Sequence, residues 1–427
     1  MKIKFSSLYL SAAGVLLHAN IVLAQATPPS IWDGLYQPLP KAEKLPEVKN
    51  DYEKNTAFLS RRFLSGKWLK SSFHKISDKA LLKNHHLAFQ IKTKRKTRTV
   101  YGINQIKEAV REIRALNTLK RMEEANTFAE ATKKAALSPF KFAKNLIEDP
   151  IDTVTGVPKG IWNYMSRVGE MATGTRSETE ESAAKELIGF SAAKRKLAYK
   201  LGINVYSQNQ DLQKEINRVA WTSYSGGFAI GEWLDSATSK QSVNVKIHAA
   251  LRDYSPEDLR KINRKRLLQM NTTEEEVQSF LSHPHYSPQL ETLLVSSLYK
   301  LHGVKGRNAF IRKAAEANSV LEAREFLSIA KLLKHYSLKK SNLESIQVSE
   351  GEILAFTGNQ NLIIPLPWDY SQWTESLANN AKKWRKKFGS DYDLEILISG
   401  YFSQRAKERL ETLNYTVTKS NDLRRRP

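Results

Sequence analysis

The sequence predicts a mainly α fold: a multi-helical body with a small basic β-hairpin near the N-terminus and a small α/β unit at the C-terminus. Three patterns support this fold class. Apolar residues recur at steps of three and four from Ile103 to Met122, capping signals repeat from Ser255 onward, and strand-like runs alternate with helical segments after residue 345. With 427 residues, 41% of them hydrophobic, the chain can form two or three domains with a sizeable core.

The first 26 residues have the pattern of a secretory signal peptide. Two lysines precede an apolar stretch over residues 5–23, and Ala24 and Ala26 suit cleavage by a signal peptidase. The apolar stretch is interrupted by His18 and Asn20, which argues against a membrane anchor. We therefore expect an exported protein, in the periplasm or alternatively secreted, without a transmembrane span after cleavage.

A Pro-rich, extended leader is expected over residues 27–60, and a small basic β segment over residues 61–101. Between residues 41 and 140 there are 23 Lys and Arg against 10 Asp and Glu. The net charge of this segment, 23 minus 10 or +13, is more than half of the formal net charge of +23. Such a surface attracts polyanions, although a Lys-rich surface that serves only solubility is the alternative. We expect an anionic envelope component or a protein partner, and no nucleic acid, to contact these residues of the predicted hairpin: Lys92, Lys94, Arg95, Lys96 and Arg98.

The helical body is predicted over residues 102–345. Its first helix follows the apolar stripe from Ile103 and continues, less apolar, to Pro139. Further on, Asp211 is a candidate N-cap, and Ser255, Thr273 and Ser319 each begin a capping box. These signals predict five helices over residues 256–269, 273–282, 288–301, 306–317 and 320–336.

The C-terminal α/β unit is predicted over residues 346–427. Its ending, from Leu394 to Thr418, reads as strand, helix and strand, which favours two adjacent parallel strands. In open α/β sheets, ligands bind beyond the carboxyl ends of strands. A candidate ligand site therefore consists of Trp368, Asp369, Tyr370 and Ser403. The alternative is that the tryptophans cover the sheet and that Ser403 caps a helix.

No catalytic, cofactor or metal site is assigned from the sequence. Ser182 and Ser191 each begin a Ser-x-x-Lys motif, as in acylating serine enzymes, but the motif occurs seven times and the accompanying elements of those enzymes are missing. We expect Ser191 to be a helix cap or a packing residue. The histidine pairs 85–86 and 283–285 lack metal-ligand spacing, and the chain has no cysteine.

Two runs, "SPFKFAKNLIEDPIDTVTGVPKGIW" and "AAKELIGFSAAKRKLAYKLGINVYSQNQDLQKEINRVAW", resemble a group of exported bacterial proteins without an assigned activity. The resemblance covers residues 101–221 and implies export, but it provides no functional residue. The expected function is non-enzymatic binding or scaffolding in the periplasm or envelope through the cationic N-terminal surface. The alternatives are an envelope-associated enzyme, with a site between the C-terminal unit and the helical body, and a secreted effector. The oligomeric state stays open.

Overall fold

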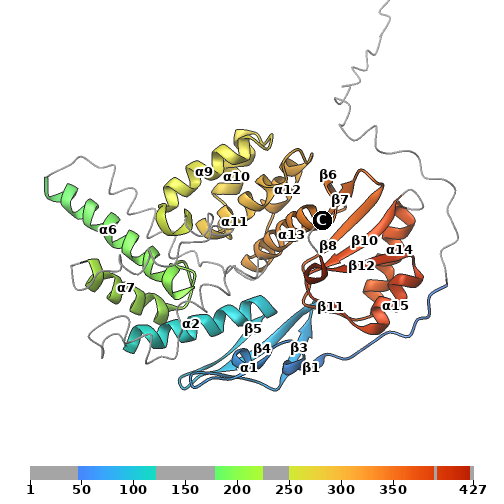
Figure 1. The fold of residues 1–427 in the computed structure, drawn as a ribbon, viewed down its shortest axis with the longest axis horizontal. Coiled ribbons are helices and arrows are strands. Elements are labelled where there is room, and N and C mark those ends of the chain that lie inside the picture. Colours follow the sequence, from blue (N-terminus) through green and yellow to red (C-terminus); the bar gives the residue numbers. More distant parts are fainter. Residues whose placement is uncertain (1–46, 122–177, 225–249, 389–391, 424–427) are drawn as a thin grey trace, which may run out of the picture.

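The computed structural model describes residues 47–121, 178–224, 250–388 and 392–423. The expected signal peptide, most of the leader and the predicted continuation of the first helix to Pro139 lie outside these residues. Along the described chain, a first sheet is followed by helices and then by a second sheet (Figure 1).

The first sheet is built around one long strand that ends in the predicted cationic turn. The strands are β1 (Ala57–Leu59), β2 (Lys75–Ile76), β3 (Lys79–Lys83), β4 (His86–Lys92) and β5 (Thr97–Tyr101), with the short helices η1 (Ser60–Arg62) and α1 (Gly66–Leu69) between β1 and β2. β4 pairs antiparallel with β2, β3 and β5, and β1 pairs with β3. Leu87, Phe89 and Ile91 alternate along β4 and face the core, as expected for a half-buried strand.

The predicted long helix is α2 (Ile103–Arg121), and it serves two cores. Its first half packs Ile106, Val110 and Ile113 on the first sheet. Its second half packs on two further helices, α6 (Glu178–Leu201) and α7 (Gln210–Tyr224). The apolar side chains of that second cluster are Ala115, Leu119, Leu197, Leu201, Leu212, Ile216, Val219 and Ala220.

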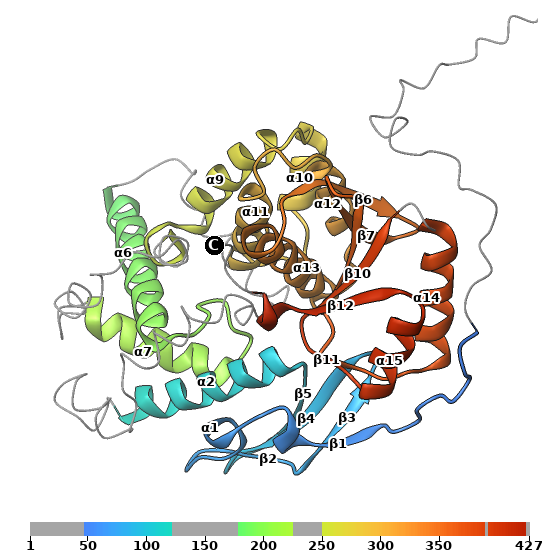
Figure 2. The ribbon, with the colours of Figure 1, turned by 45° about the vertical axis from the view of Figure 1, so that its right-hand side comes forward.

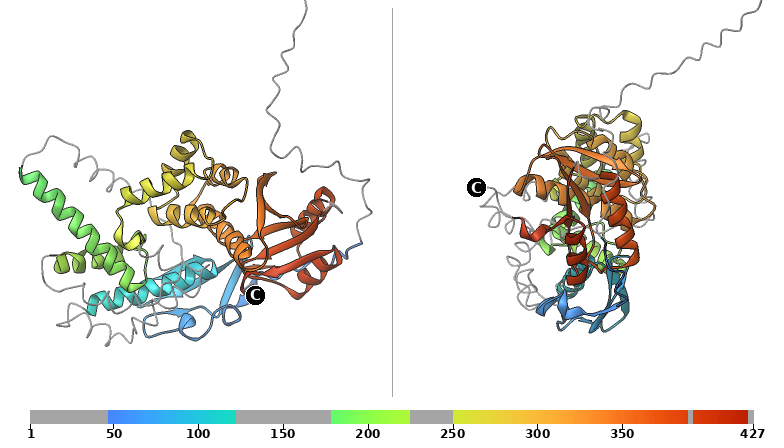
Figure 3. Two further views of the ribbon diagram at one scale, coloured as in Figure 1. Left: turned by 45° about the horizontal axis from the view of Figure 1, so that its top comes forward. Right: turned by 90° about the vertical axis from the view of Figure 1, so that its right-hand side faces the viewer.

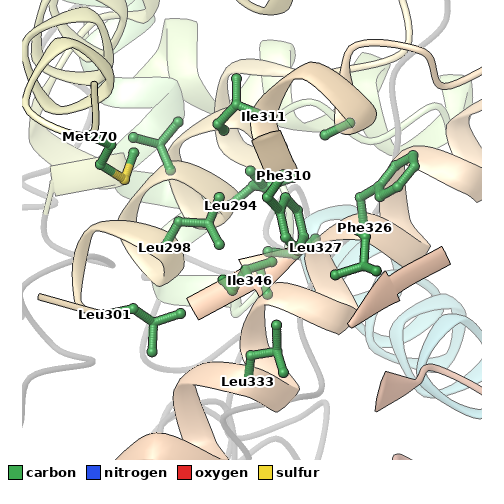
Figure 4. Packing of buried hydrophobic residues seen from close by; sticks show 14 of the residues in the cluster. Met270, Leu294, Leu298, Leu301, Phe310, Ile311, Phe326, Leu327, Leu333 and Ile346 are labelled. Atoms are coloured by element: carbon green, nitrogen blue, oxygen red, sulfur yellow. The ribbon is translucent and has the colours of Figure 1, made fainter. Parts of the chain in front are cut away.

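The five predicted helices of the body are confirmed, with small differences at their ends. They are α9 (Pro256–Leu268), α10 (Glu274–Leu281), α11 (Pro288–Tyr299), α12 (Arg307–Ala314) and α13 (Val320–Lys339). The side chains of Ser255, Thr273 and Ser319 each accept a backbone N–H at the start of a helix. Figure 4 shows the apolar cluster between these helices, in which Leu294, Phe310 and Leu327 are buried.

The second sheet lies between the helical body and two C-terminal helices (Figure 2). Its strands, in the order β12-β10-β8-β7-β6, are β6 (Leu343–Ser349), β7 (Glu352–Thr357), β8 (Asn361–Leu366), β10 (Asp393–Ile398) and β12 (Tyr415–Lys419). The covering helices are α14 (Glu375–Phe388) and α15 (Gln404–Thr412), and η3 (Ser420–Asp422) follows β12. The predicted parallel pairing of β10 with β12 is confirmed.

Alternate residues of this sheet enter two different cores, which gives three layers. Ile363 and Leu397 pack against the helical body, whereas Ile364 and Ile396 pack against α14 and α15. Strands that are covered on both faces are largely apolar, as β8 and β10 are apart from Asn361, Asp393 and Glu395. A parallel pair beside this sheet, β9 (Tyr370–Ser371) and β11 (Tyr401–Phe402), connects it to the first sheet through backbone bonds to His85.

The predicted mainly α fold class is wrong. The described residues form two five-stranded sheets and one two-stranded sheet beside the helices. The sequence pattern did not identify β1, β2, β3 and β6 as strands, and β1 and β2, of three and two residues, are too short to show alternation. It also treated the C-terminal unit as a small addition, although that sheet is the middle layer of the molecule. In the part of the chain that the structure describes, no helix is both long and apolar enough to span a membrane.

Candidate functional site

The predicted cationic turn joins β4 to β5 and is closed by Thr93. Its backbone N–H donates to the carbonyl oxygen of Lys96 over 2.9 Å, and its Oγ1 accepts the Lys96 N–H over 3.2 Å. Lys94, Arg95 and Lys96 are left exposed. The turn therefore presents three consecutive cations at one end of the first sheet.

A pocket of about 400 Å³ lies between this turn and the C-terminal half of α2, and we call it the basic pocket. Its lining residues are Ser72, Phe73, Thr93, Lys94, Arg95, Lys96, Arg98, Ile113, Leu116, Asn117, Lys120, Arg121, Asn209 and Asp211. Six of these side chains are cationic and one is a carboxylate. Lys120 and Arg121 belong to the last turn of α2, where the partial negative charge of the helix end stabilises cations.

A second pocket, also of about 400 Å³, adjoins the basic pocket, and we call it the amide pocket. Its lining residues are Lys96, Arg98, Val100, Gln105, Ala109, Glu112, Ser207, Gln208, Asn209, Gln210, Asp211 and Arg324. Lys96 and Asp211 line both pockets, and their Nζ and Oδ2 atoms are 3.4 Å apart. This ion pair therefore stands where the two pockets meet.

Charges in the amide pocket are compensated within the protein. The Arg98 Nη2 atom lies 3.7 Å from Glu112 Oε2, and Ser207 Oγ donates to Glu112 Oε1. Burial lowers the pKa of the Arg324 guanidinium, which Glu108 and Glu112 oppose. The surplus positive charge is therefore concentrated in the basic pocket.

The start of α7 forms the wall opposite the turn, and here the predicted cap is wrong. Asn209, not Asp211, precedes the helix, and its Oδ1 atom accepts the Leu212 N–H over 3.4 Å. Asp211 lies in the first turn, where its side chain can turn outward to Lys96. The pattern was ambiguous because both residue types are common N-caps.

Four of the five predicted contact residues converge on the pockets. Lys94, Arg95, Lys96 and Arg98 line the basic pocket, whereas Lys92 lies on the opposite face of the sheet, paired with Lys75 and Thr97. Lys120, Arg121 and Asn117 also line the basic pocket but were not among the predicted contact residues. A signal was present, because two cations end the apolar stripe of α2, but their distance from the turn is set by tertiary packing.

In the predicted ligand site of the C-terminal unit, Asp369 has a structural role. Its Oδ1 atom accepts the Ile103 N–H over 3.0 Å, and its Oδ2 atom accepts the Leu87 N–H over 2.9 Å. The Asp369 carboxylate thus caps the N-terminus of α2 and binds β4 at the same time. His86 Nδ1 lies 3.7 Å from Oδ2 of the same carboxylate.

Trp368 and Tyr370 pack against the first sheet. The Trp368 ring stacks on His85, with ring centroids 3.7 Å apart, and burial lowers the pKa of His85 to about 4. Tyr370 is buried with its ring centroid 4.9 Å from that of Phe58. These aromatic contacts hold the second sheet against the first.

Ser403 and Trp373 have the structural roles that were the alternative to ligand binding, namely capping a helix and covering the sheet. Ser403 Oγ accepts the Ala406 N–H over 3.0 Å at the start of α15 and donates to the Glu53 carboxylate. Trp373 is fully buried under the second sheet. The polar side-chain atoms of Asp369 and Ser403 are therefore engaged by the protein itself.

The remaining residues considered from the sequence, Ser191 and the histidine pair 283–285, line neither pocket. Ser191 lies inside α6, so of its two expected roles only packing fits, and burial lowers the pKa of the nearby Lys194 to about 8. His283 Nδ1 accepts the His285 N–H over 3.3 Å just after α10. Among the described residues, no three His, Asp or Glu side chains gather in a way that could hold a metal ion.

Comparisons with protein-family models, with curated proteins and with solved structures find no match for this chain.

Proposed function

We propose that this chain is a non-enzymatic binding protein of the cell envelope that holds a phosphate-bearing ligand in the basic pocket. The single observation that carries the proposal is the lining of that pocket by six cationic side chains among the described residues, around about 400 Å³. Two of the six, Lys96 and Arg98, face the carboxylates of Asp211 and Glu112. A volume of this size suits a headgroup or one unit of a polymer. Arginine forks and lysine ammonium groups are the side chains that proteins use for phosphate.

The pocket supports binding better than catalysis. Among the described residues that line it, Asp211 is the one carboxylate, this carboxylate is paired with Lys96, and none is a histidine. The donors of Asn117, Asn209 and Thr93 can orient a ligand, while the cations supply the attraction. The proposed location in the envelope rests on the N-terminal sequence pattern, and N-terminal sequencing of the protein recovered outside the cytoplasm would test it.

Calorimetric titration of the full chain tests the ligand chemistry. We would use inorganic pyrophosphate, a water-soluble short-chain phosphatidylglycerol and a poly(glycerol phosphate), so that a lipid headgroup and a wall polymer are distinguished by affinity. Binding should weaken as salt rises, because surface cations are screened over about 10 Å at 0.1 M ionic strength.

A triple variant identifies the pocket. Lys94→Gln, Arg95→Gln and Lys120→Gln together should weaken pyrophosphate binding about tenfold or more, because three charge-assisted bonds are lost. The matched control is Lys75→Gln, Lys79→Gln and Lys83→Gln, which removes the same charge from the other face of the first sheet. Equal weakening in both variants, or in neither, would contradict the proposed pocket.

A further inference from the structure

The first sheet has a second face that α2 does not cover, and we call it the outer sheet face. It consists of twelve residues that alternate with the core positions, namely Ala57, Leu59, Lys75, Lys79, Leu81, Lys83, Ala88, Gln90, Lys92, Thr97, Thr99 and Tyr101. His86 belongs to the same alternation but is buried against Glu325, and Ala88 is buried between its neighbours, so His86 is not counted in this face. Figure 3 shows from two further directions that this sheet lies at the edge of the molecule. Three large apolar side chains on it are exposed: Leu59 by 45%, Leu81 by 55% and Tyr101 by 43%.

Strand register arranges these side chains in rows across the sheet. Ala57 is paired with Leu81, Leu81 with Ala88, and Ala88 with Tyr101, so one apolar row crosses four strands. Neighbouring strands are about 4.8 Å apart, which makes this row roughly 14 Å long. Leu59, two residues from Ala57 on the same face, extends the row into a patch.

Lysines flank the apolar row on both sides. Lys83 lies two residues beyond Leu81 toward the turn with β4, and Lys79 lies two residues before it. Lys75 and Lys92 form a cross-strand pair at the far end of the sheet. Four of the twelve residues of the outer sheet face are therefore lysines, and none of the twelve is Asp or Glu.

We infer that the outer sheet face docks on an anionic lipid bilayer. Leucine and tyrosine side chains enter the boundary between headgroups and acyl chains, while lysines remain at the level of the anionic headgroups. Each lysine near such a surface adds to the attraction. This surface is separate from the basic pocket, so it does not depend on the proposed function.

Two other occupants fit the arrangement less well. Protein interfaces are depleted in lysine relative to the rest of the surface, whereas one third of this face is lysine. Nucleic acid could pair its phosphates with the lysines, but its phosphate backbone provides no apolar environment in which a leucine side chain could be buried. An apolar row between cations matches a bilayer surface, because the acyl chains and the anionic headgroups of a bilayer lie next to each other in depth.

Vesicle co-sedimentation of the full chain tests this inference. The protein should partition onto phosphatidylcholine vesicles that contain phosphatidylglycerol and be released from vesicles of phosphatidylcholine alone. Lys75→Gln, Lys79→Gln and Lys83→Gln together should lower the partition coefficient more than about tenfold. The control with equal charge loss is Lys94→Gln, Arg95→Gln and Lys120→Gln, which should lower it less.

A second pair of variants separates insertion from charge attraction. Leu59→Ser with Leu81→Ser should lower partitioning about tenfold while leaving its salt dependence unchanged, because no charge is altered. Leu338→Ser is the matched control, since Leu338 is 60% exposed on α13. These leucines are exposed, so their replacement leaves the core intact, which thermal unfolding would verify.

Two results would overturn the inference. One is unchanged partitioning in the lysine variant of the outer sheet face. The other is unchanged partitioning in the leucine variant together with full displacement of the protein from vesicles by heparin, which would assign the face to a soluble polyanion. Pyrophosphate titration of the same variants reports on the basic pocket alone, so failure of one proposal is distinguishable from failure of the other.

Discussion

The Nε2 atom of His86 lies 2.7 Å from the Oε1 atom of Glu325, which joins the first sheet to α13. The same imidazole faces Asp369, which precedes β9, so three parts of the chain meet at one side chain. Burial alone would lower the pKa of His86, but the two carboxylates outweigh it and raise this pKa to about 9. The imidazole is therefore protonated at neutral pH and forms two charged contacts.

Replacing His86 with Gln should lower the free energy of unfolding at pH 6 by as much as about 3 kcal/mol. The sign follows from the raised pKa in the folded state: the contribution is complete below the ordinary value of 6.5 and is lost as pH rises through about 9. Urea unfolding of both proteins at pH 6, 8 and 10 measures it. A gap between them that stays constant over this range would show that His86 acts by packing alone.

The ionised form of Glu291 destabilises the fold, whereas the charged form of His86 stabilises it. It is fully buried in α11, and among the described residues neither of its carboxylate oxygens accepts a hydrogen bond. Burial raises its pKa to about 8, although Arg260, 4.0 Å away, opposes the shift. Folding therefore becomes less favourable as pH rises from the ordinary value of 4.5 through about 8, because over this range the unfolded chain releases the proton that the buried carboxyl keeps.

Glu291→Gln should therefore be more stable than the original protein at pH 8.5, by a few kcal/mol, and about equal to it near pH 4.5. Thermal unfolding at both pH values tests this expectation. Glu257→Gln is the control, because the Glu257 side chain is 78% exposed. Destabilisation of the Glu291→Gln variant at both pH values would refute the explanation.

Gly400 allows two backbone segments to touch. A Cβ atom at this position would lie 2.6 Å from the carbonyl oxygen of Trp368 and would collide with the backbone of Asp369. Gly400→Ala should therefore separate β11 from β9 and cost about 1–3 kcal/mol of stability, or more if Asp369 loses its contacts. Thermal unfolding gives the measurement, and Gly358→Ala is the control because its added methyl group meets only the flexible Glu344 side chain. Equal stability of the two variants would show that the segments can shift freely.

Local signals explain what the sequence could predict. The capping signals at Ser255, Thr273 and Ser319 act within four residues, and the helices that they begin were found almost to the residue. Thr273 forms a complete capping box with Glu276, whereas Ser255 and Ser319 are N-caps without the reciprocal bond. The β4–β5 hairpin and its cationic turn were also visible, because alternation and turn chemistry are local.

Long-range partners explain what could not be predicted. Asp369 follows a strand, as a ligand-binding residue would, yet its acceptors are used by Leu87 and Ile103, more than 260 positions away. Lys120 and Arg121 read as an ordinary helix end until packing brings them to the turn at Lys94. The balance of helix and strand was misjudged for the same reason, because β1 and β2 exist only through their neighbours in the sheet.

Helix α2 links the basic pocket to the second half of the chain through its two ends. One end is held by a carboxylate from the second half of the chain, and the other forms a wall of the basic pocket. An N-terminal fragment that stops before β6 would leave the amide groups of Leu87 and Ile103 without their acceptor. The first sheet and α2 are thus no detachable module, because two of their backbone amides depend on Asp369 for an acceptor.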